Sequence, residues 1–259
     1  MEAGFTASIF LINLYRFRFF LTAFRFPPQF VTLLKMSQEA FIKAYFKGIQ
    51  KVFTALGMDA EMSVKAIWAG TKAMISNDGV KLNQQRFWEV FSKLMQLDAQ
   101  KRIIVEEACD RFYSNEFDAV KSVLEPSQIP KRLIHSIKSK GYNAVLATNP
   151  LFPECAVTTR LNWIGLNSQD FTYITHYSNS SYCKPNPEYY REILRVIDKK
   201  PEQCLMAGNN ANEDMSAAEL GIETYLVTDY LENESGIDIT AFRKGSLAEF
   251  EIYLSKLLA

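Results

Sequence analysis

The sequence has few histidines and few cysteines, and neither residue type forms a metal-binding cluster. Only two of the 259 residues are His and four are Cys. A His-rich metal site is therefore excluded. The cysteines are scattered and show no metal-ligand spacing, which favours reduced thiols in a cytoplasmic protein over a zinc site or a disulfide framework. The formal net charge is zero, so we expect no nucleic-acid partner.

Residues 1–35 contain no Asp and no apolar run long enough to cross a bilayer. The longest uncharged run, residues 3–15, is shorter than the roughly 20 residues of a transmembrane helix. A secretory signal fits poorly, because there is no cationic start or small-residue cleavage site. The segment is rich in Phe and Arg, and three interpretations stay open. The segment is a buried first strand with disordered residues, a basic, aromatic segment at a membrane surface, or the result of a wrongly assigned start of the gene. We do not expect a membrane partner.

Between residues 38 and 125 the apolar residues recur at helical spacing. Ser37 is a suitable N-cap for a first helix, and Gly57 is a suitable residue to end it. Further helical patterns cover residues 60–75, 84–96 and 98–113. We find no alternation of apolar and polar residues typical of strands. The block therefore predicts a bundle of helices that precedes the α/β part of the chain.

From residue 126 onward, apolar strands alternate with helical segments. In residues 204–230 an apolar run stops at Gly208, a polar turn follows, a short helix ends at Gly221, and a second apolar run begins. This order predicts a parallel βαβ unit. Similar alternation recurs, with strands expected at 142–147 and 171–175 and helices at 131–140, 153–161, 187–197 and 247–258. The pattern is typical of a doubly wound parallel sheet, which binds ligands beyond the carboxyl ends of its strands.

Three polar motifs lie at those ends. Thr148-Asn149 ends a strand, Lys184-Pro185 precedes a helix, and the turn after Gly208 contains Glu213 and Asp214. Their order and spacing resemble motifs two, three and four of the haloacid dehalogenase (HAD) superfamily. The residues of the three motifs are similar to those of a subgroup of its phosphohydrolases. The resemblance is close from residue 130 onward, about half the chain. It implies a Rossmann-like α/β core and an inserted α-helical cap; the core is expected at 1–37 and 126–259 and the cap at 38–125.

The resemblance also implies roles for these residues. Thr148, with Asn149 beside it, corresponds to the phosphate-binding hydroxyl, and Lys184 corresponds to the cation that offsets the phosphate charge. Asp214, with Glu213 and Asn210, corresponds to the ligands of Mg²⁺, a metal that prefers oxygen donors. Simpler interpretations remain open for each motif. Thr148 can cap a turn, Lys184 can be a surface lysine, and the two acids can favour the start of a helix through its dipole.

The first HAD motif, a strand followed by Asp-x-Asp-x-Thr, has no acidic counterpart. If Thr32 ends the motif, Pro28 and Phe30 occupy the two Asp positions. If the strand lies at residues 9–15, Asn13 and Tyr15 occupy them. Neither placement supplies the nucleophile and the proton donor that the family's aspartyl-phosphate chemistry requires. Asn210 also stands where the subgroup pattern has Asp.

Two functional predictions follow from this combination. The first is a HAD-type phosphohydrolase of an unknown small phosphate monoester, impaired or inactive in this sequence because the Asp-x-Asp pair is absent. The alternative is a non-catalytic HAD-fold protein that binds a phosphorylated ligand or a protein partner. Both need a first strand at the centre of the sheet. We expect residues 8–15 or 26–34 there, and Pro27 and Pro28 argue against the second segment because proline is poorly tolerated in a central strand.

Overall fold

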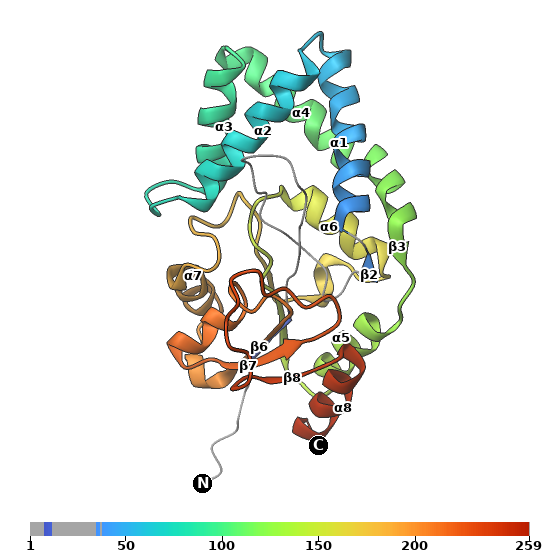
Figure 1. The fold of residues 1–259 in the computed structure, drawn as a ribbon, viewed down its shortest axis with the longest axis vertical. Helices are drawn as coiled ribbons and strands as arrows, with labels where there is room; N and C mark the ends of the chain where they lie inside the picture. Colours follow the sequence, from blue (N-terminus) through green and yellow to red (C-terminus); the bar gives the residue numbers. More distant parts are fainter. Residues whose placement is uncertain (1–7, 12–34, 37, 259) are drawn as a thin grey trace.

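The computed structural model describes residues 8–11, 35–36 and 38–258. Helices gather at one end of the molecule, and a sheet flanked by further helices forms the other end (Figure 1). The helical end contains α1 (Gln38–Ala55), α2 (Ala60–Ile75), α3 (Asn83–Leu94) and α4 (Ala99–Ser114). Each lies within two residues of the bounds that the sequence predicts, which confirms the helical character of this block.

Local caps and close packing explain why this block forms. The side chains of Asp59 and Asp98 accept hydrogen bonds from backbone N–H groups in the first turns of α2 and α4, as N-cap residues do. Gly70 lets α2 approach α3 closely, because an added Cβ atom would lie 2.6 Å from the ring of Phe87. The rings of Phe53 and Phe91 also pack against each other, with centroids 5.7 Å apart. The helices therefore form their own aromatic core.

A two-stranded antiparallel sheet joins the two ends of the helical block. Its strands are β2 (Lys35–Met36) and β3 (Leu124–Glu125), and Met36 pairs with Leu124. A 3₁₀ helix, η1 (Glu116–Val123), leads from α4 to β3. The sequence pattern does not predict this pairing, since two-residue strands carry no alternation. The pairing brings the ends of the expected cap together, while the domain boundaries themselves stay a prediction.

The main sheet has six parallel strands in the order β5-β4-β1-β6-β7-β8. They are β1 (Ser8–Leu11), β4 (Asn143–Leu146), β5 (Tyr173–Ile174), β6 (Cys204–Gly208), β7 (Glu223–Val227) and β8 (Arg243–Gly245). Leu11 is paired with Leu146 on one side and with Ala207 on the other. The central strand thus lies within residues 8–15, as one of the two predictions states. The other segment, residues 26–34, lies outside the described residues.

Helices cover the sheet, in the arrangement expected of a doubly wound fold. They are α5 (Ile129–Ser139), α6 (Glu154–Trp163), α7 (Pro187–Ile197) and α8 (Leu247–Leu257). The segment expected to be helical after the polar turn is the short 3₁₀ helix η4 (Met215–Leu220), which ends at Gly221 with a φ of 85°. In the part of the chain that the structure describes, no helix has the length and apolar character needed to cross a membrane.

Candidate active site

The loops that follow β4 and β6 meet the start of α7 at one edge of the sheet. Thr148 comes two residues after β4, Asp214 comes after β6, and Lys184 comes just before α7. All three residues are buried, with exposed fractions of 1% or less. The structure therefore brings the three sequence motifs together, because parallel strands present their carboxyl ends at the same edge. Lys184 is not a surface lysine.

The centre of the site is an ion pair between Lys184 and Asp214. The Lys184 Nζ atom lies 2.7 Å from Asp214 Oδ1, and both side chains are fully buried. The second oxygen of Asp214 accepts a hydrogen bond from the backbone N–H of Asn210, at 3.0 Å. The rings of Tyr189 and Tyr190 lie 5.5 and 5.8 Å from the ammonium group. Burial lowers the pKa of Lys184, although the carboxylate of Asp214 opposes the shift.

Glu213 lies beside this pair and is also buried. Burial, followed by the neighbouring charge of Asp214, raises the pKa of Glu213 to about 8. Burial raises the pKa of Asp214 to about 6, and Lys184 limits that rise. Near pH 7 the site therefore favours a protonated Glu213 beside an ionised Asp214, because two adjacent buried carboxylates repel each other.

Asn149 connects the three motifs through its side-chain amide. Its Nδ2 atom donates to Glu213 Oε2 at 3.2 Å, and its Oδ1 atom accepts from the backbone N–H of Lys184 at 3.2 Å. The hydroxyl of Thr148 is 3.5 Å from the carbonyl oxygen of Asn149. This distance is too long for a strong hydrogen bond. The geometry leaves the Thr148 hydroxyl able to donate to a ligand, whereas the Asn149 amide holds the loops in place.

Three further residues support the loops, and the sequence motifs did not identify them. The hydroxyls of Thr175 and Tyr189 donate to the carbonyl oxygen of Thr148, at 2.6 and 2.7 Å. The hydroxyl of Tyr190 donates to the carbonyl oxygen of Glu213 at 2.9 Å. The tyrosine pair at the start of α7 is visible in the sequence, but its hydrogen-bond partners depend on the tertiary structure. These bonds fix the backbone on both sides of the ion pair.

Asn210 shapes the turn after β6. Its Oδ1 atom accepts hydrogen bonds from the backbone N–H groups of Asn212 and Glu213, at 2.9 and 2.8 Å. Its Nδ2 atom donates to Glu232 Oε2 at 2.8 Å, and Glu232 is only 2% exposed. The sequence analysis did not identify Glu232, since it lies in a polar segment without a motif. The contact places a buried carboxylate next to the position where the family pattern has Asp.

The residues expected to hold Mg²⁺ are already bonded to other groups. Asp214 accepts from Lys184 and from the Asn210 backbone, and the Asn210 oxygen accepts from two backbone N–H groups. Within the described ranges, no group of three or more His, Cys, Asp or Glu side chains could hold a metal ion. As arranged, these side chains do not fit the oxygen-rich coordination that Mg²⁺ requires. The assignment of Asp214, Asn210 and Glu213 as metal ligands stays a prediction.

The two placements of the first motif fall on residues 13 and 15 and on residues 28 and 30. Asn13, Tyr15, Pro28 and Phe30 all lie outside the described residues. The sequence itself still limits the chemistry, because residues 12–36 contain neither Asp nor Glu. No carboxylate therefore follows the central strand before α1.

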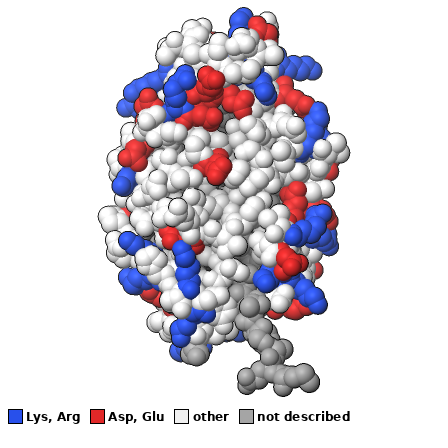
Figure 2. Space-filling view, turned by 180° about the vertical axis from the view of Figure 1, so that it is seen from behind, with Lys and Arg blue, Asp and Glu red and all other residues white. Residues whose placement is uncertain are grey.

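The surface differs from this buried site. On the face shown in Figure 2, Lys and Arg side chains are interspersed with Asp and Glu side chains around a largely uncharged middle. Surface ion pairs such as Lys65–Glu61 keep more than half of each side chain exposed. Water screens such pairs, whereas the Lys184–Asp214 pair is shielded from solvent.

A family model described as haloacid dehalogenase-like hydrolase matches residues 31–221. A pyrophosphatase PpaX from Bacillus mycoides (strain KBAB4) is 25% identical over 142 residues, which cover 54% of this chain and 61% of the relative. Another, from Bacillus thuringiensis (strain Al Hakam), is 23% identical over 140 residues, with the same coverage of 54% and 61%. The chain thus matches about three fifths of the length of these curated relatives.

Two solved structures share the fold over nearly the whole chain. A HAD phosphatase from Thermococcus onnurineus is 15% identical, covers 96% of this chain and 97% of its own, and gives a TM-score of 0.53. An L-2-haloacid dehalogenase is 13% identical, covers 97% and 99%, and gives a TM-score of 0.56. At these identities the likeness concerns the fold alone, and it includes enzymes with different chemistry. Together with the family match over residues 31–221, the fold shows that this chain belongs to the haloacid dehalogenase-like hydrolases.

Proposed function

We propose that this chain binds the phosphate group of a phosphorylated small molecule and, in the sequence given, hydrolyses it slowly or not at all. One observation carries the proposal. The central strand β1 lies between the two strands whose loops form the site, yet residues 12–36 contain no Asp or Glu. The site therefore keeps groups that bind an anion, while the sequence after β1 supplies no carboxylate nucleophile.

Lys184 and Thr148 are the proposed phosphate ligands. An ammonium group has three N–H donors, and Asp214 accepts from one of those on Lys184. The proposal assigns the remaining donors to a phosphate oxygen, together with the Thr148 hydroxyl and backbone N–H groups of the surrounding loops. The names of the curated relatives, which are pyrophosphatases, support a phosphorylated ligand.

The missing acids bear on hydrolysis more than on binding. The family match begins at residue 31, after the Asp positions of both placements. The position of β1 favours the placement with Asn13 and Tyr15, because Asn13 follows Leu11 by two residues, as Thr148 follows Leu146. Both placements lack a nucleophile. Removing a catalytic nucleophile typically lowers a rate by about 10⁴- to 10⁶-fold.

Mg²⁺ is not required for the phosphate binding proposed here. Hydrolases of this family generally use Mg²⁺, but the hydrogen bonds of Asp214 and Asn210 argue against a preformed metal site. We therefore expect phosphate to bind without a divalent cation. We also propose that residues 38–125 form a cap over the site, that the protein is cytoplasmic and that its ligand is a phosphorylated small molecule.

Calorimetric titration of the whole chain with inorganic phosphate in EDTA tests the proposal. We expect saturable binding that Thr148→Val weakens by about tenfold, because the variant removes one hydrogen-bond donor to a charged ligand. Thr172→Val is the matched control, since Thr172 lies at the opposite end of the strands and bonds to Asn143. Absence of phosphate binding by the unmodified chain, or equal weakening by both variants, would overturn the proposal.

A further inference from the structure

The N-terminal end of α3 lies against the loop between β5 and α7, the loop that carries Lys184. The backbone N–H of Asn83 donates to the carbonyl oxygen of Ser180 at 2.9 Å. The backbone N–H of Gln84 donates to the carbonyl oxygen of Tyr177 at 2.8 Å. Because the first N–H groups of a helix have no acceptor within it, this loop supplies the acceptors that the first turn of α3 needs. The two bonds join the helical block to the part of the molecule that contains the sheet.

The side chain of Asn83 contacts both loops that carry the proposed phosphate ligands. Asn83 is fully buried, with an exposed fraction of 0%. Its Nδ2 atom lies 3.3 Å from the carbonyl oxygen of Pro150, two residues after Thr148. The same atom lies 3.4 Å from the carbonyl oxygen of Tyr182, two residues before Lys184. Each contact is long for a hydrogen bond, but a single amide of the helical block connects the two segments.

Hydrogen bonds within the helical block fix the orientation of this amide. The Nδ2 atom of Asn77 donates to the Oδ1 atom of Asn83 at 2.8 Å. Asn77 is held in turn by Arg86, whose Nε atom donates to the Asn77 Oδ1 atom at 3.1 Å. An amide side chain has one acceptor oxygen and two N–H donors. Because Asn77 occupies the oxygen of Asn83, both donors of Asn83 are directed at the carbonyl oxygens of the loops.

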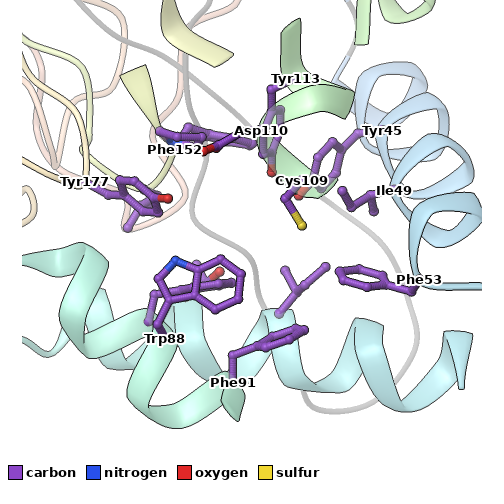
Figure 3. Close-up of a pocket in the computed structure, with 15 residues that line it drawn as sticks. Tyr45, Ile49, Phe53, Trp88, Phe91, Cys109, Asp110, Tyr113, Phe152 and Tyr177 are labelled. Atoms are coloured by element: carbon purple, nitrogen blue, oxygen red, sulfur yellow. Dashed lines mark hydrogen bonds between the residues drawn. The ribbon is translucent and has the colours of Figure 1, made fainter. Parts of the chain in front are cut away.

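Apolar packing between the helical block and the two loops leaves a gap. Figure 3 shows Trp88 and Phe91 of α3 across an open centre from Phe152 and Tyr177, which belong to the loops after β4 and β5. These four residues are among those that line a cavity of about 40 Å³. Atoms that border a cavity lack contact partners on that side. The polar contacts around Asn83 therefore contribute more to the attachment than they would in a closely packed interface.

We propose that Asn83 is a positioning residue, which fastens the helical block to both loops and thereby holds Thr148 and Lys184 in place for a phosphate. The inference rests on the proposed phosphate site and adds to it a residue from outside the sheet and its loops. The arrangement differs from a lid that a ligand closes, because the bonds of Asn83 and Gln84 join groups of the chain itself.

Hydrogen exchange of the whole chain, followed by NMR in D₂O, tests the fastening. The N–H groups of Asn83 and Gln84 have no acceptor within α3, so their protection from exchange reports the contact with the loop. Without phosphate, both should exchange within about tenfold of the rate in the middle of α3. Free exchange of both groups without phosphate would overturn the inference. Protection that appears only after inorganic phosphate is added would identify a lid closed by its ligand, which also overturns it.

A variant tests the positioning role. Asn83→Leu keeps the number of side-chain heavy atoms but removes both donors, which leaves buried carbonyl oxygens unsatisfied. The Gln84 N–H should exchange at least about tenfold faster, while N–H groups in the middle of α3 keep their rates. Calorimetry in EDTA should show inorganic phosphate binding at least about fivefold weaker. Asn115→Leu is the matched control and should change neither result, because the Asn115 side chain donates to the carbonyl oxygen of Arg111 within α4.

The outcomes separate this inference from the proposed function. If Asn83→Leu binds phosphate as tightly as the unmodified chain, the inference is wrong and the phosphate site stands. If the unmodified chain binds no phosphate, the proposed function and the positioning role both fail, and the exchange rates still decide whether Asn83 fastens the helical block. Should Asn83→Leu fail to fold, Asn77→Ala carries the test, because it removes the bond that orients the Asn83 amide. It should change exchange at Gln84 and phosphate affinity about two- to fivefold in the same directions, and unchanged values would contradict the inference.

Discussion

The two sides of the candidate site differ in charge. On the side of β4 and β6, Lys184, Asp214 and Glu213 are buried together and hydrogen bonded. On the side of β1, the sequence from residue 12 to residue 36 contains no acid. The difference teaches that binding a phosphate and attacking it depend on different residues. A chain can keep the first set and lack the second.

The absence of the Asp-x-Asp pair also changes how many negative charges Lys184 has to offset. In a site with an Asp-x-Asp pair, cations must offset several carboxylates as well as the phosphate. Here Lys184 offsets Asp214, while the raised pKa of Glu213 favours its neutral form at pH 7. Fewer negative charges make the pocket more favourable for an anion. The predictions below test whether this charged side is built as the structure indicates.

The largest expected effect comes from removing the cation. Lys184→Met leaves Asp214 buried without its partner, and breaking a buried pair in this way typically lowers the free energy of unfolding by about 3–5 kcal/mol. Urea unfolding measures the change, and calorimetry should show loss of phosphate binding. Lys65→Met is the control, because Lys65 is exposed in its pair with Glu61. A loss of stability no greater than that of the control would contradict the role of the buried pair.

A smaller loss of stability is expected when the Asp of the family pattern is restored at position 210. Asn210→Asp removes the donor to Glu232 and places two buried carboxylates together, at a cost of roughly 1–3 kcal/mol. Thermal unfolding in EDTA measures it, and added Mg²⁺ should recover more stability in the variant than in the unmodified chain. Asn212→Asp is the control on an exposed residue of the same turn. Equal Mg²⁺ responses of the two variants would argue against a restored metal ligand.

The pH dependence of the free energy of unfolding should reveal the ionisation of Glu213. Its pKa is about 8 in the folded chain against an ordinary value of 4.5, so the folded state binds more protons between these values. The stabilising contribution is complete below about pH 4.5 and is lost as the pH rises to about 8. Between pH 5 and 8, Glu213→Gln should make the decline in unfolding free energy shallower by on the order of 2 kcal/mol. Urea unfolding at four pH values tests this, and parallel curves would refute it.

The smallest effect concerns the tyrosine that supports the loop. Tyr190→Phe removes the hydroxyl that donates to the carbonyl oxygen of Glu213, and it should lower the free energy of unfolding by about 1 kcal/mol. Tyr253→Phe is the control, since that hydroxyl donates to the exposed Glu223. We expect Tyr190→Phe also to weaken phosphate binding slightly. A change confined to the control would show that the loop does not depend on this bond.

Much of the charged side could be predicted from the sequence. Thr148 and Asp214 follow apolar strands, and Lys184 precedes a helix whose bounds, 187–197, match α7. Because parallel strands share one direction, residues at their carboxyl ends must meet. The order of the six strands, by contrast, is defined by their pairing and not by the alternation of strands and helices alone.

Other features depended on contacts that no local pattern encodes. Strand β8 is a three-residue segment, Arg243–Gly245, without apolar alternation, so only its pairing with β7 defines it. The partners of Tyr190 and the contact of Glu232 with Asn210 join residues 23 and 22 positions apart. The side chains of Asn149 and Asn210 were assigned to ligands by resemblance, and the structure shows that both also hold backbone N–H groups of the loops. Their proposed ligand roles stay predictions.

The most direct test of the central claim is release of inorganic phosphate from a panel of small phosphate monoesters in the presence of Mg²⁺. The unmodified chain would be compared with Asn13→Asp/Tyr15→Asp and with Pro28→Asp/Phe30→Asp, which restore the acid pair in the two placements. We predict no release above the blank from the unmodified chain and turnover from one of the variants, because a nucleophile typically accounts for at least about 10⁴-fold in rate. Turnover by the unmodified chain that Lys184→Met abolishes would contradict the claim.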